Sequence, residues 1–492
     1  MKTVQEYLDE TPVWSDGTPM HDVPLTSMQW WILVLAAAGK FFEGMIVFIT
    51  GVALPLITVE FGLGPMEKGA IAAATLGGIL VGATVLGGLA DQVGRKTMFC
   101  VEMALFCLFL VLTALSPSFP VLMVCLFGLG MALGCDYPTA HLVVSESIPS
   151  RVRGRLVLAT FGFQSVGALA GTVLGFAVLR VDGSLADWRW MYALVVIPAL
   201  VVTVGRLFVP ESGHWLAAKG RREEAERVLG QLLNREPRYP RQFALHAPTL
   251  ASHRAEVKVS DLFRKKHRRA TILASVPWFL QDLSTYGIGI FTPTILAATL
   301  GVTKTHDHNL SGIILEDIQA VKGAALIDVL LLVGIVVAFV LVDRVGRIRL
   351  QFWGFLGCAV GLAIAAMSTH FTGLVQTVLI FAGFMLFNFM TNLGPNAMTY
   401  VLAGEVFPTR VRGAGAGLAA SVGKVGAVLT AFLFPILLKD LGVDVLLGIL
   451  VGASVLGAVV THRFAVETNG VSLEKVGCEE AEVSGPVVPT AT

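Results

Sequence analysis

The sequence predicts an all-α integral membrane protein with twelve transmembrane helices in two related six-helix bundles. Composition is the first of three observations behind this prediction, since 55% of the 492 residues are hydrophobic and only 14% are charged. Soluble domains contain roughly 45–50% apolar and about 25% charged residues, which argues against a soluble enzyme. The second observation is the number of long apolar segments, and the third is a repeat that relates the two halves of the chain.

The apolar segments are long enough to cross a bilayer, which takes about 20 mostly apolar residues per helix. The first half of the chain contains six of them, at residues 30–57, 68–90, 97–116, 119–142, 155–179 and 189–209. The second half contains six more, at residues 271–299, 323–342, 349–369, 372–403, 412–438 and 441–462. The chain therefore divides into a polar N-terminal segment (1–29), a first bundle (30–209), a central loop (210–270), a second bundle (271–463) and a tail (464–492).

Basic residues in the loops predict how the chain is oriented. Of the 36 Lys and Arg residues, 27 fall on one side of the predicted bilayer and six on the other. Because Lys and Arg accumulate on the cytoplasmic side, both termini and the central loop are predicted to be cytoplasmic. The central loop has a helical pattern near 220–233. Residues 1–29 lack the basic start of a secretory signal, so the first apolar segment is predicted to be a retained span. We expect a multi-pass protein of the cell (plasma) membrane.

The two halves repeat a set of loop charges. The acidic and basic residues concerned are Asp91, Arg95, Glu146 and Arg153 in the first half, and Asp343, Arg347, Glu405 and Arg412 in the second. Such repeats predict a duplicated six-helix unit, with the substrate site at the membrane midplane between the halves. We expect these charged clusters to bias one closed state, which is a gating role rather than a binding role.

Ionisable side chains inside the apolar segments are candidates for function, because each costs about 2.5–3.5 kcal/mol at the membrane centre on insertion scales. These residues are Lys40, Glu43, Asp136, Asp282, Asp328 and Lys424. A spacing of four residues places Trp278, Asp282 and Tyr286 on one face of a helix. Asp136 lies next to a tyrosine and a proline, which predicts an aqueous cavity where the backbone is locally opened. Lys424 is a mid-span cation that needs an anionic partner.

The loop motifs resemble those of the major facilitator superfamily over residues 30–475, and Pro210-Glu211-Ser212 resembles its sugar-porter-like branch. The motifs inside the spans resemble the phosphate:proton symporter family. They include Gly134-x-Asp136-Tyr137-Pro138 in the fourth span, Trp278-x3-Asp282-x3-Tyr286 in the seventh, Gly394-Pro395-Asn396 in the tenth and Gly423-Lys424-Val-Gly426 in the eleventh. The resemblance implies the major facilitator fold and proton-coupled symport (uptake) of inorganic phosphate by alternating access.

The resemblance also implies a set of site residues. The substrate-binding residues carried over from the family are Tyr137, Gln164, Trp278, Asp282, Tyr286, Asn396 and Lys424. The proton-coupling residues are Glu43, Asp136 and Asp282. The first span departs from the family, which has two aspartates three residues apart in it. In this chain Glu43 occupies the first of these positions and Ile46 the second. Lys40 adds a cation one turn before Glu43, where it can neutralise the carboxylate.

Other functions compete with phosphate uptake. A proton-coupled symporter of an organic anion, such as an aromatic or short carboxylate, would use the same cation. A nutrient receptor would be expected to have a longer tail than the roughly thirty residues after the last span. A membrane enzyme would need a catalytic or metal constellation, and the sequence contains no H-E-x-x-H and no C-x-x-C. A nucleotide-driven pump is disfavoured because no G-x4-G-K-[ST] loop occurs.

The expected partners follow from this interpretation. We expect a small anionic substrate, protons and the lipid bilayer as partners, with no cofactor and no metal. The net charge of +1 offers no basic surface for a nucleic acid. We expect a single chain to be the functional unit.

Overall fold

The computed structural model describes residues 2–12, 24–86, 89–181, 183–234, 245, 259–300, 310–407 and 411–466. Within these ranges the regular structure is helical, and Lys2 and Leu245 form an isolated bridge. Ten helical stretches of the described residues are long and apolar enough to cross a membrane. The chain is thus an all-α membrane protein, as the composition predicted.

The first half contains six long helical segments, and each overlaps one predicted span. Its elements are α2 (Ser27–Phe61), α3 (Pro65–Val81) with the π-helical turn η1 (Gly82–Leu86), α4 (Ala90–Val93), α5 (Arg95–Ala114), α6 (Phe119–Ser147), α7 (Ser150–Val181) and α8 (Asp187–Leu207). α2 begins at a capping box in which Gln29 N donates to Thr26 Oγ1 at 3.2 Å and Thr26 N donates to Gln29 Oε1 at 2.8 Å. It ends at Gly62, whose φ of +63° suits a residue without a Cβ.

The second half follows the same plan. Its elements are η3 (Val259–Phe263), α11 (Lys265–Leu300), α12 (Leu310–Val345), α13 (Arg347–Met367), η4 (Ser368–His370), α14 (Gly373–Leu393), α15 (Pro395–Glu405) and α16 (Arg412–Arg463). α16 contains the last two predicted spans, which meet at a kink where Gly442 has a φ of +82°. Counting α16 as two spans and including α11 accounts for the twelve predicted segments. α12 begins thirteen residues before the predicted span at 323, so the apolar pattern marked only its membrane-like part.

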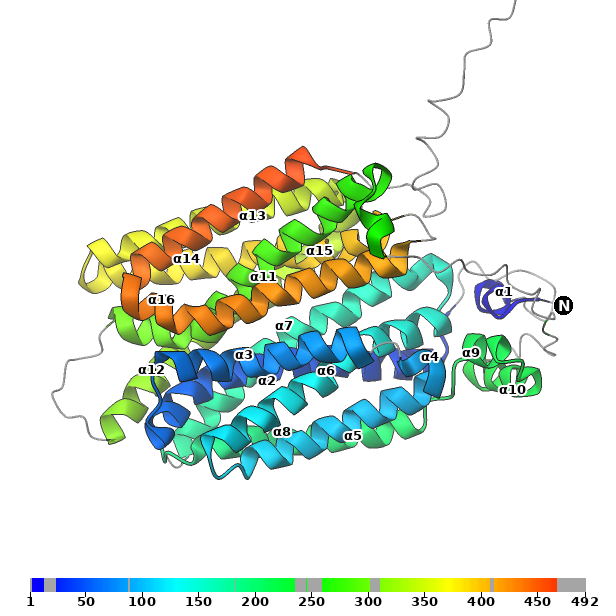
Figure 1. The fold of residues 1–492 in the computed structure, drawn as a ribbon, viewed down its shortest axis with the longest axis horizontal. Coiled ribbons are helices and arrows are strands. Elements are labelled where there is room, and N and C mark those ends of the chain that lie inside the picture. Colours follow the sequence, from blue (N-terminus) through cyan, green and yellow to red (C-terminus); the bar gives the residue numbers. More distant parts are fainter. Residues whose placement is uncertain are drawn as a thin grey trace, which may run out of the picture.

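Helix packing divides the long helices into two bundles that lie side by side (Figure 1). In the first bundle α2 packs on α7, α3 on α6, and α5 on α6 and α8. In the second bundle α11 packs on α16, and α13 packs on α14 and α16. Three pairs of helices make most of the contact between the bundles: α7 with α12, α3 with α16, and α2 with α11. The interface between the bundles is therefore built from helices at equivalent places in the repeat.

Small residues allow the two helices that carry the site to approach closely. A Cβ on Gly44 of α2 would collide with the backbone carbonyl of Gln164 in α7, and a Cβ on Gly167 of α7 would collide with that of Phe41 in α2. Close backbone contact of this kind is the usual way in which membrane helices pack, since lipid provides no hydrophobic drive between them. The contact fixes Gln164 next to the turn of α2 that bears Glu43.

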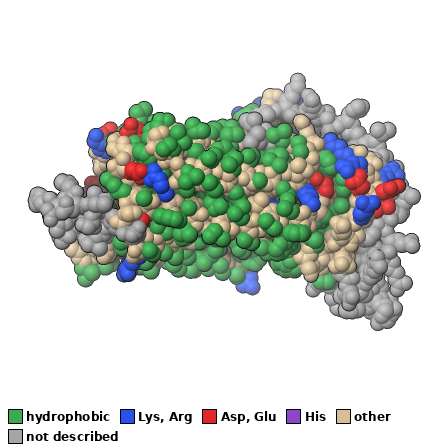
Figure 2. Space-filling view, turned by 90° about the horizontal axis from the view of Figure 1, so that it is seen from below, with side chains coloured by type: hydrophobic (Ala, Val, Ile, Leu, Met, Phe, Trp, Pro, Cys, Tyr) green, Lys and Arg blue, Asp and Glu red, His purple; other side chains and the backbone are tan. Residues whose placement is uncertain are grey.

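The outer surface of the bundles is apolar. Figure 2 shows a broad band of hydrophobic side chains across the middle of the face in view, with charged side chains mainly toward its two ends. Outward-facing residues such as Val124 and Val201 are 68% and 69% exposed. A continuous exposed apolar surface of this size marks contact with lipid.

Three short helices gather beyond one end of the first bundle (Figure 1): α1 (Val4–Asp9), α9 (Gly213–Ala218) and α10 (Arg222–Leu232). They share a small hydrophobic core that includes Val4, Leu8, Leu216 and Leu229. The helical pattern predicted near 220–233 is confirmed by α10. We call this side of the molecule the motif end, because the repeated loop charges lie there.

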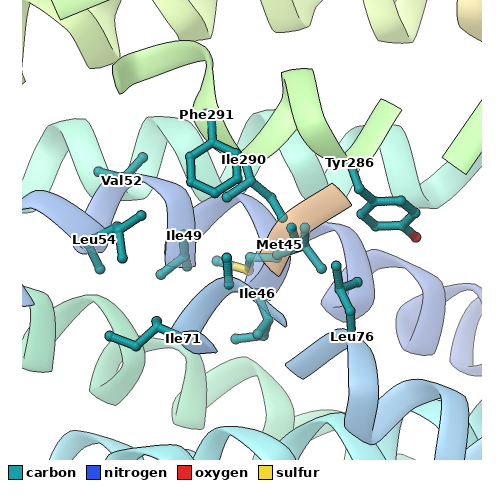
Figure 3. Close-up of a cluster of buried hydrophobic side chains, with 14 of the residues drawn as sticks. Met45, Ile46, Ile49, Val52, Leu54, Ile71, Leu76, Tyr286, Ile290 and Phe291 are labelled. Atoms are coloured by element: carbon teal, nitrogen blue, oxygen red, sulfur yellow. The ribbon is translucent and has the colours of Figure 1, made fainter. Parts of the chain in front are cut away.

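Ile46 lies in an apolar cluster rather than at a polar surface. Figure 3 shows it among Ile49 of α2, Ile71 and Leu76 of α3 and, beyond them, Ile290 of α11. Its side chain is fully buried. The departure from the family pattern at this position thus has a structural counterpart, because the side chain here packs in a mainly apolar cluster.

We predict that Ile46→Asp strongly destabilises the protein, because burying an unpaired acid at this depth costs about 2.5–3.5 kcal/mol. Ile46→Val is the matched control and should cost about 1 kcal/mol. Thermal unfolding of the purified protein in detergent, followed by size-exclusion chromatography, measures both. An aspartate variant as stable as the valine variant would mean that position 46 reaches water or a cation.

Candidate functional site

A cavity of about 380 Å³ lies between the two bundles. Its walls come from α2, α3, η1, α6 and α7 on one side and from α11, α15 and α16 on the other. Six of the seven predicted substrate-binding residues line it: Gln164, Trp278, Asp282, Tyr286, Asn396 and Lys424. The side chain of the seventh, Tyr137, lies outside the described part of the structure. Residues far apart in the sequence are therefore brought to one cavity, as the resemblance implied.

Four charged side chains meet in the wall of this cavity. Lys40 Nζ lies 2.5 Å from Glu43 Oε2, one helical turn along α2. Lys424 Nζ of α16 lies 3.3 Å from Glu43 Oε1 and 3.6 Å from Asp282 Oδ2 of α11. We call these four residues the charge quartet. With all four ionised, its two ammonium groups balance its two carboxylates.

Tyr286 links the quartet to the neutral donors. Its hydroxyl accepts a hydrogen bond from Lys424 Nζ at 2.6 Å and from Gln164 Nε2 at 3.2 Å, and donates to Glu43 Oε1 at 3.3 Å. The Lys424 ammonium also lies 4.5 Å from the centroid of the Tyr286 ring, which adds a cation–π contact. The phenol, itself on α11, thus links Gln164 of α7 and Glu43 of α2 in one bundle to Lys424 of α16 in the other.

The two carboxylates of the quartet are held unequally. Glu43 contacts both lysines and receives the Tyr286 hydroxyl, whereas Asp282 contacts Lys424 alone within the quartet. Asp282 Oδ2 accepts no hydrogen bond from the described residues, although the side chain is buried. A carboxylate with few stabilising contacts in a buried place is the one that takes up a proton most readily.

An amide network continues from the cavity into the second bundle. Asn396 Nδ2 donates to Asn392 Oδ1 at 2.6 Å, and Asn396 Oδ1 accepts from Gln281 Nε2 at 3.0 Å. Asn392 Nδ2 in turn donates to Ser165 Oγ of α7 at 2.7 Å, which crosses to the first bundle. α14 ends before Gly394 and α15 begins at Pro395. This interruption of the helix places the Asn396 amide in the cavity wall.

Aromatic rings meet across the bundle interface beside the cavity. The ring of Phe161 in α7 stacks on Tyr400 in α15, with centroids 4.5 Å apart and an angle of 16° between the rings. Trp278 meets Tyr400 edge-on at 6.4 Å. These contacts join the two bundles beside the quartet, since Lys40 Nζ lies 5.8 Å from the Phe161 ring centroid.

Asp136 does not line the central cavity, contrary to the expectation from its motif. Its carboxylate faces the interior of the first bundle, where its Oδ1 lies 2.5 Å from Arg206 Nη2 of α8. The same guanidinium lies 3.2 Å from Glu102 Oε1 of α5. The reason for the difference is that Arg206 is fully buried and needs counter-charges from its neighbours.

The loop motifs form matched ion pairs at the motif end. Arg95 contacts Glu146 through Nε at 3.3 Å and Nη2 at 3.2 Å, and Arg347 contacts Glu405 through Nε at 3.2 Å and Nη2 at 3.4 Å. Each arginine also donates to a backbone carbonyl five residues earlier, Ala90 and Val342. Equal geometry at repeat-related positions is what a duplicated unit predicts. Each pair lies within one bundle, so it fixes the end of that bundle.

The other predicted gating residues are placed differently or not described. Arg153 donates to Gln5 Oε1 of α1 at 2.7 Å, so its nearest described partner comes from the N-terminal helix. The side chains of Asp91, Asp343 and Arg412 lie outside the described part of the structure. Among the described residues no group of three or more His, Cys, Asp or Glu side chains is arranged to hold a metal ion.

Sequence reasoning missed two of the buried charges. Glu102 and Arg206 lie within the apolar segments predicted at 97–116 and 189–209, yet only the ionisable residues near mid-span were selected. The available signal was the same one that identified Asp136: a charge in a stretch that is otherwise apolar.

Comparisons with known proteins show relatives with different cargoes. A family model described as sugar (and other) transporter matches residues 32–479. The niacin transporter NiaP of Acinetobacter baylyi is 28% identical over 83% of this chain and 87% of its own length. The repressible high-affinity phosphate permease of Neurospora crassa is 28% identical over 81% of this chain and 76% of its own length. The partially occluded, inward open structure of the xylose transporter XylE from E. coli has a TM-score of 0.73 at 19% identity, covering 91% of this chain and all of that one.

His214 in α9 gives a prediction about the motif end. Its Nδ1 lies 3.1 Å from the backbone oxygen of Glu146, and burial lowers the pKa of His214 below its ordinary value of 6.5. The folded protein therefore favours the neutral imidazole, while the unfolded chain binds a proton below pH 6.5. Stability should be highest above about pH 6.5 and fall as the pH drops below it.

The thermal unfolding temperature measured between pH 5 and 8 tests this dependence. His214→Gln should flatten the loss of stability on the acid side, and the exposed His370→Gln should leave it unchanged. If the His214→Gln profile follows that of the wild type, another group governs the acid sensitivity.

Proposed function

The chain belongs to the sugar (and other) transporter family and has the major facilitator fold, so we propose that it is a secondary active transporter. We propose that it moves a small anion together with protons. Inorganic phosphate is the expected cargo, because the polar residues carried over from the phosphate:proton symporters are retained in one cavity. The mechanism proposed is alternating access, in which the two bundles rock about the central site.

The charge quartet is the observation that supports this proposal. With all four side chains ionised, the quartet has no net charge to attract an anion. Lys424 then forms ion pairs with Glu43 and Asp282. Protonation of Asp282 removes one negative charge and leaves the cavity with an excess positive charge. An anion can then take the place of the carboxylate beside Lys424. A proton and an anion thus favour each other's binding, which is the linkage that a symporter requires.

The size of this linkage follows from Coulomb's law. A unit charge pair at 4 Å interacts by about 4 kcal/mol at an effective dielectric constant of 20. An anion bound beside an ionised Asp282 loses that amount, whereas a protonated Asp282 donates a hydrogen bond to it. Glu43 stays ionised in this scheme because two lysines and the Tyr286 hydroxyl hold it. Its proposed role is to keep Lys40 and Lys424 at a fixed distance across the cavity.

The neutral donors complete an anion site. Gln164, Tyr286 and Asn396 border the cavity with Lys424, and Trp278 adds an indole N–H group. Because Gln164 belongs to the first bundle and the other residues to the second, an anion bound among them contacts both bundles. Rocking of the bundles would then break or form these contacts, which makes access depend on the occupant of the site.

The proposed orientation comes from the loop charges. Both termini, the central loop and the motif end are placed in the cytoplasm of a plasma-membrane protein by the excess of Lys and Arg there. The cavity is lined near this end by Ala83, Ala414 and Gly417, at the ends of η1 and α16 that approach the cytoplasmic side. We propose that the structure corresponds to a state whose site lies nearer the cytoplasm.

An organic carboxylate is the second candidate cargo, and the walls of the cavity favour it. Ile79, Leu80, Phe161 and Leu418 line the space beside the quartet. One water molecule takes about 30 Å³ of liquid, so a cavity of about 380 Å³ has room for an anion with an apolar body. The niacin transporter among the relatives is consistent with such a cargo.

Uptake into proteoliposomes tests the proposal and separates the cargoes. Radiolabelled phosphate should enter when an inward proton gradient is imposed, and excess benzoate should not compete. Lys424→Ala should abolish uptake, and Lys424→Arg should restore little, since a planar guanidinium does not replace a compact ammonium. Competition by benzoate together with no phosphate uptake would favour the organic carboxylate. Normal uptake by Lys424→Ala would contradict the proposed site.

Asp282→Asn tests the coupling step, because asparagine imitates the protonated acid. The variant should bind the anion with little dependence on pH and should fail to accumulate it against a gradient. Equilibrium binding of labelled phosphate at several pH values, together with uptake under a proton gradient, measures both properties. Ser421→Ala is the matched control at the cavity wall. Binding as sensitive to pH in Asp282→Asn as in the wild type would assign the proton to another group.

A further inference from the structure

A second group of buried charges lies inside the first bundle, outside the central cavity. Arg206 of α8 lies at its centre, with Nη2 at 2.5 Å from Asp136 Oδ1 and Nη1 at 3.2 Å from Glu102 Oε1. The arginine has no solvent exposure, and the two acids are almost as deeply buried. The guanidinium also donates to the backbone oxygens of Phe99 and Leu35, at 2.8 and 3.2 Å.

The number of charges in this group is unbalanced. Two carboxylates face one guanidinium, and Glu102 Oε2 accepts no hydrogen bond from the described residues. If both acids were ionised, the group would have a net negative charge within the low dielectric of the membrane, at a cost of several kcal/mol. One proton shared by the two carboxyl groups, which contact the same guanidinium, restores neutrality. Like charges in one buried place favour such sharing.

The groups around this trio offer no second cation in direct contact among the described residues. On α5 the titratable neighbours are the thiols of Cys100 and Cys107, and on α6 the thiol of Cys135. α2 contributes Lys40, whose ammonium pairs with Glu43 and acts on Asp136 at longer range. Thiols do not compensate a negative charge, so the proton is the remaining means of balance.

The trio is adjacent to the central site through α2. A Cβ on Gly39 would overlap the Asp136 carboxylate, so this acid packs directly on the α2 backbone. The next residue, Lys40, extends into the central cavity and contacts Glu43. A change in charge on Asp136 is therefore transmitted to the quartet by electrostatic interaction with Lys40.

We propose that Glu102 and Asp136, held by Arg206, form a second proton-binding site that takes the place of the acid missing at position 46. This inference rests on the proposed function, because it assigns the second proton of a proton-coupled transporter. Glu102 is the new member of the site. Arg206 positions both carboxyl groups and prevents them from binding a second proton together, since it needs one ionised partner.

Infrared spectroscopy of the purified full-length protein, without anion or gradient, tests the site. The absorbance of protonated carboxylic acids should fall by the same amount in Glu102→Gln and in Asp136→Asn, because the remaining acid then ionises to balance Arg206. The double variant should lose no more than either single variant. Glu60→Gln is the control, since Glu60 is paired with Arg189 at 2.7 Å and should contribute nothing to that absorbance.

Each outcome of the spectroscopic test is decisive. An unchanged absorbance in both single variants would mean that both acids are ionised and would overturn the proposal. Failure of both single variants to fold would also overturn it, because each replacement imitates the shared proton and preserves charge balance. The result does not depend on whether phosphate is the cargo, so failure of the proposed function is recognised separately.

A transport measurement then tests whether this proton takes part in coupling. The ratio of protons to anions is obtained from the membrane potential at which net flux reverses. It should fall in Glu102→Gln and stay unchanged in Glu60→Gln. An unchanged ratio in Glu102→Gln would overturn the role of the site in transport.

Discussion

A charge inside the hydrocarbon layer is costly unless another charge or a hydrogen-bond donor balances it, and this chain balances its buried charges across helices that are distant in sequence. Lys424 of α16 meets Glu43 of α2 and Asp282 of α11. Arg206 of α8 meets Asp136 of α6 and Glu102 of α5. These contacts determine which faces of the helices turn inward. Any movement of a proton or an anion into the site has to change the balance, and this requirement is the physical basis of the proposed coupling.

The repeat supplies the frame in which the balance is maintained. Arg95 with Glu146 and Arg347 with Glu405 fix the same end of each bundle by the same geometry. The two pairs thus hold each bundle together at this end, while several contacts between the bundles lie beside the cavity. The aromatic stack of Phe161 on Tyr400 and the hydrogen bond from Gln164 to Tyr286 both cross that interface. Contacts of this kind can be broken and remade without disturbing either bundle.

Most of the fold could be predicted from the sequence, because lipid imposes a simple demand for long apolar helices. The resemblance to the phosphate:proton symporter family implied a site made of Gln164, Trp278, Asp282, Asn396 and Lys424, and these residues line one cavity. Spacing within one helix also predicted the Lys40–Glu43 pair, which the structure confirms. The position of Asp136 could not be predicted in this way. Its inward orientation depends on how α5 packs against both α6 and α8, and no local pattern encodes the match between three helices. Similarly, the burial of Ile46 in an apolar cluster depends on α3.

The most direct test of the account is the number of protons taken up when the anion binds. Calorimetric titration of the purified protein with phosphate gives this number, when it is repeated in buffers of different ionisation enthalpy at a pH where phosphate is a monoanion. The charge balance of the quartet predicts uptake of about one proton per anion in the wild type. It predicts no proton uptake in Asp282→Asn. Binding of phosphate with no proton uptake by the wild type would contradict the account.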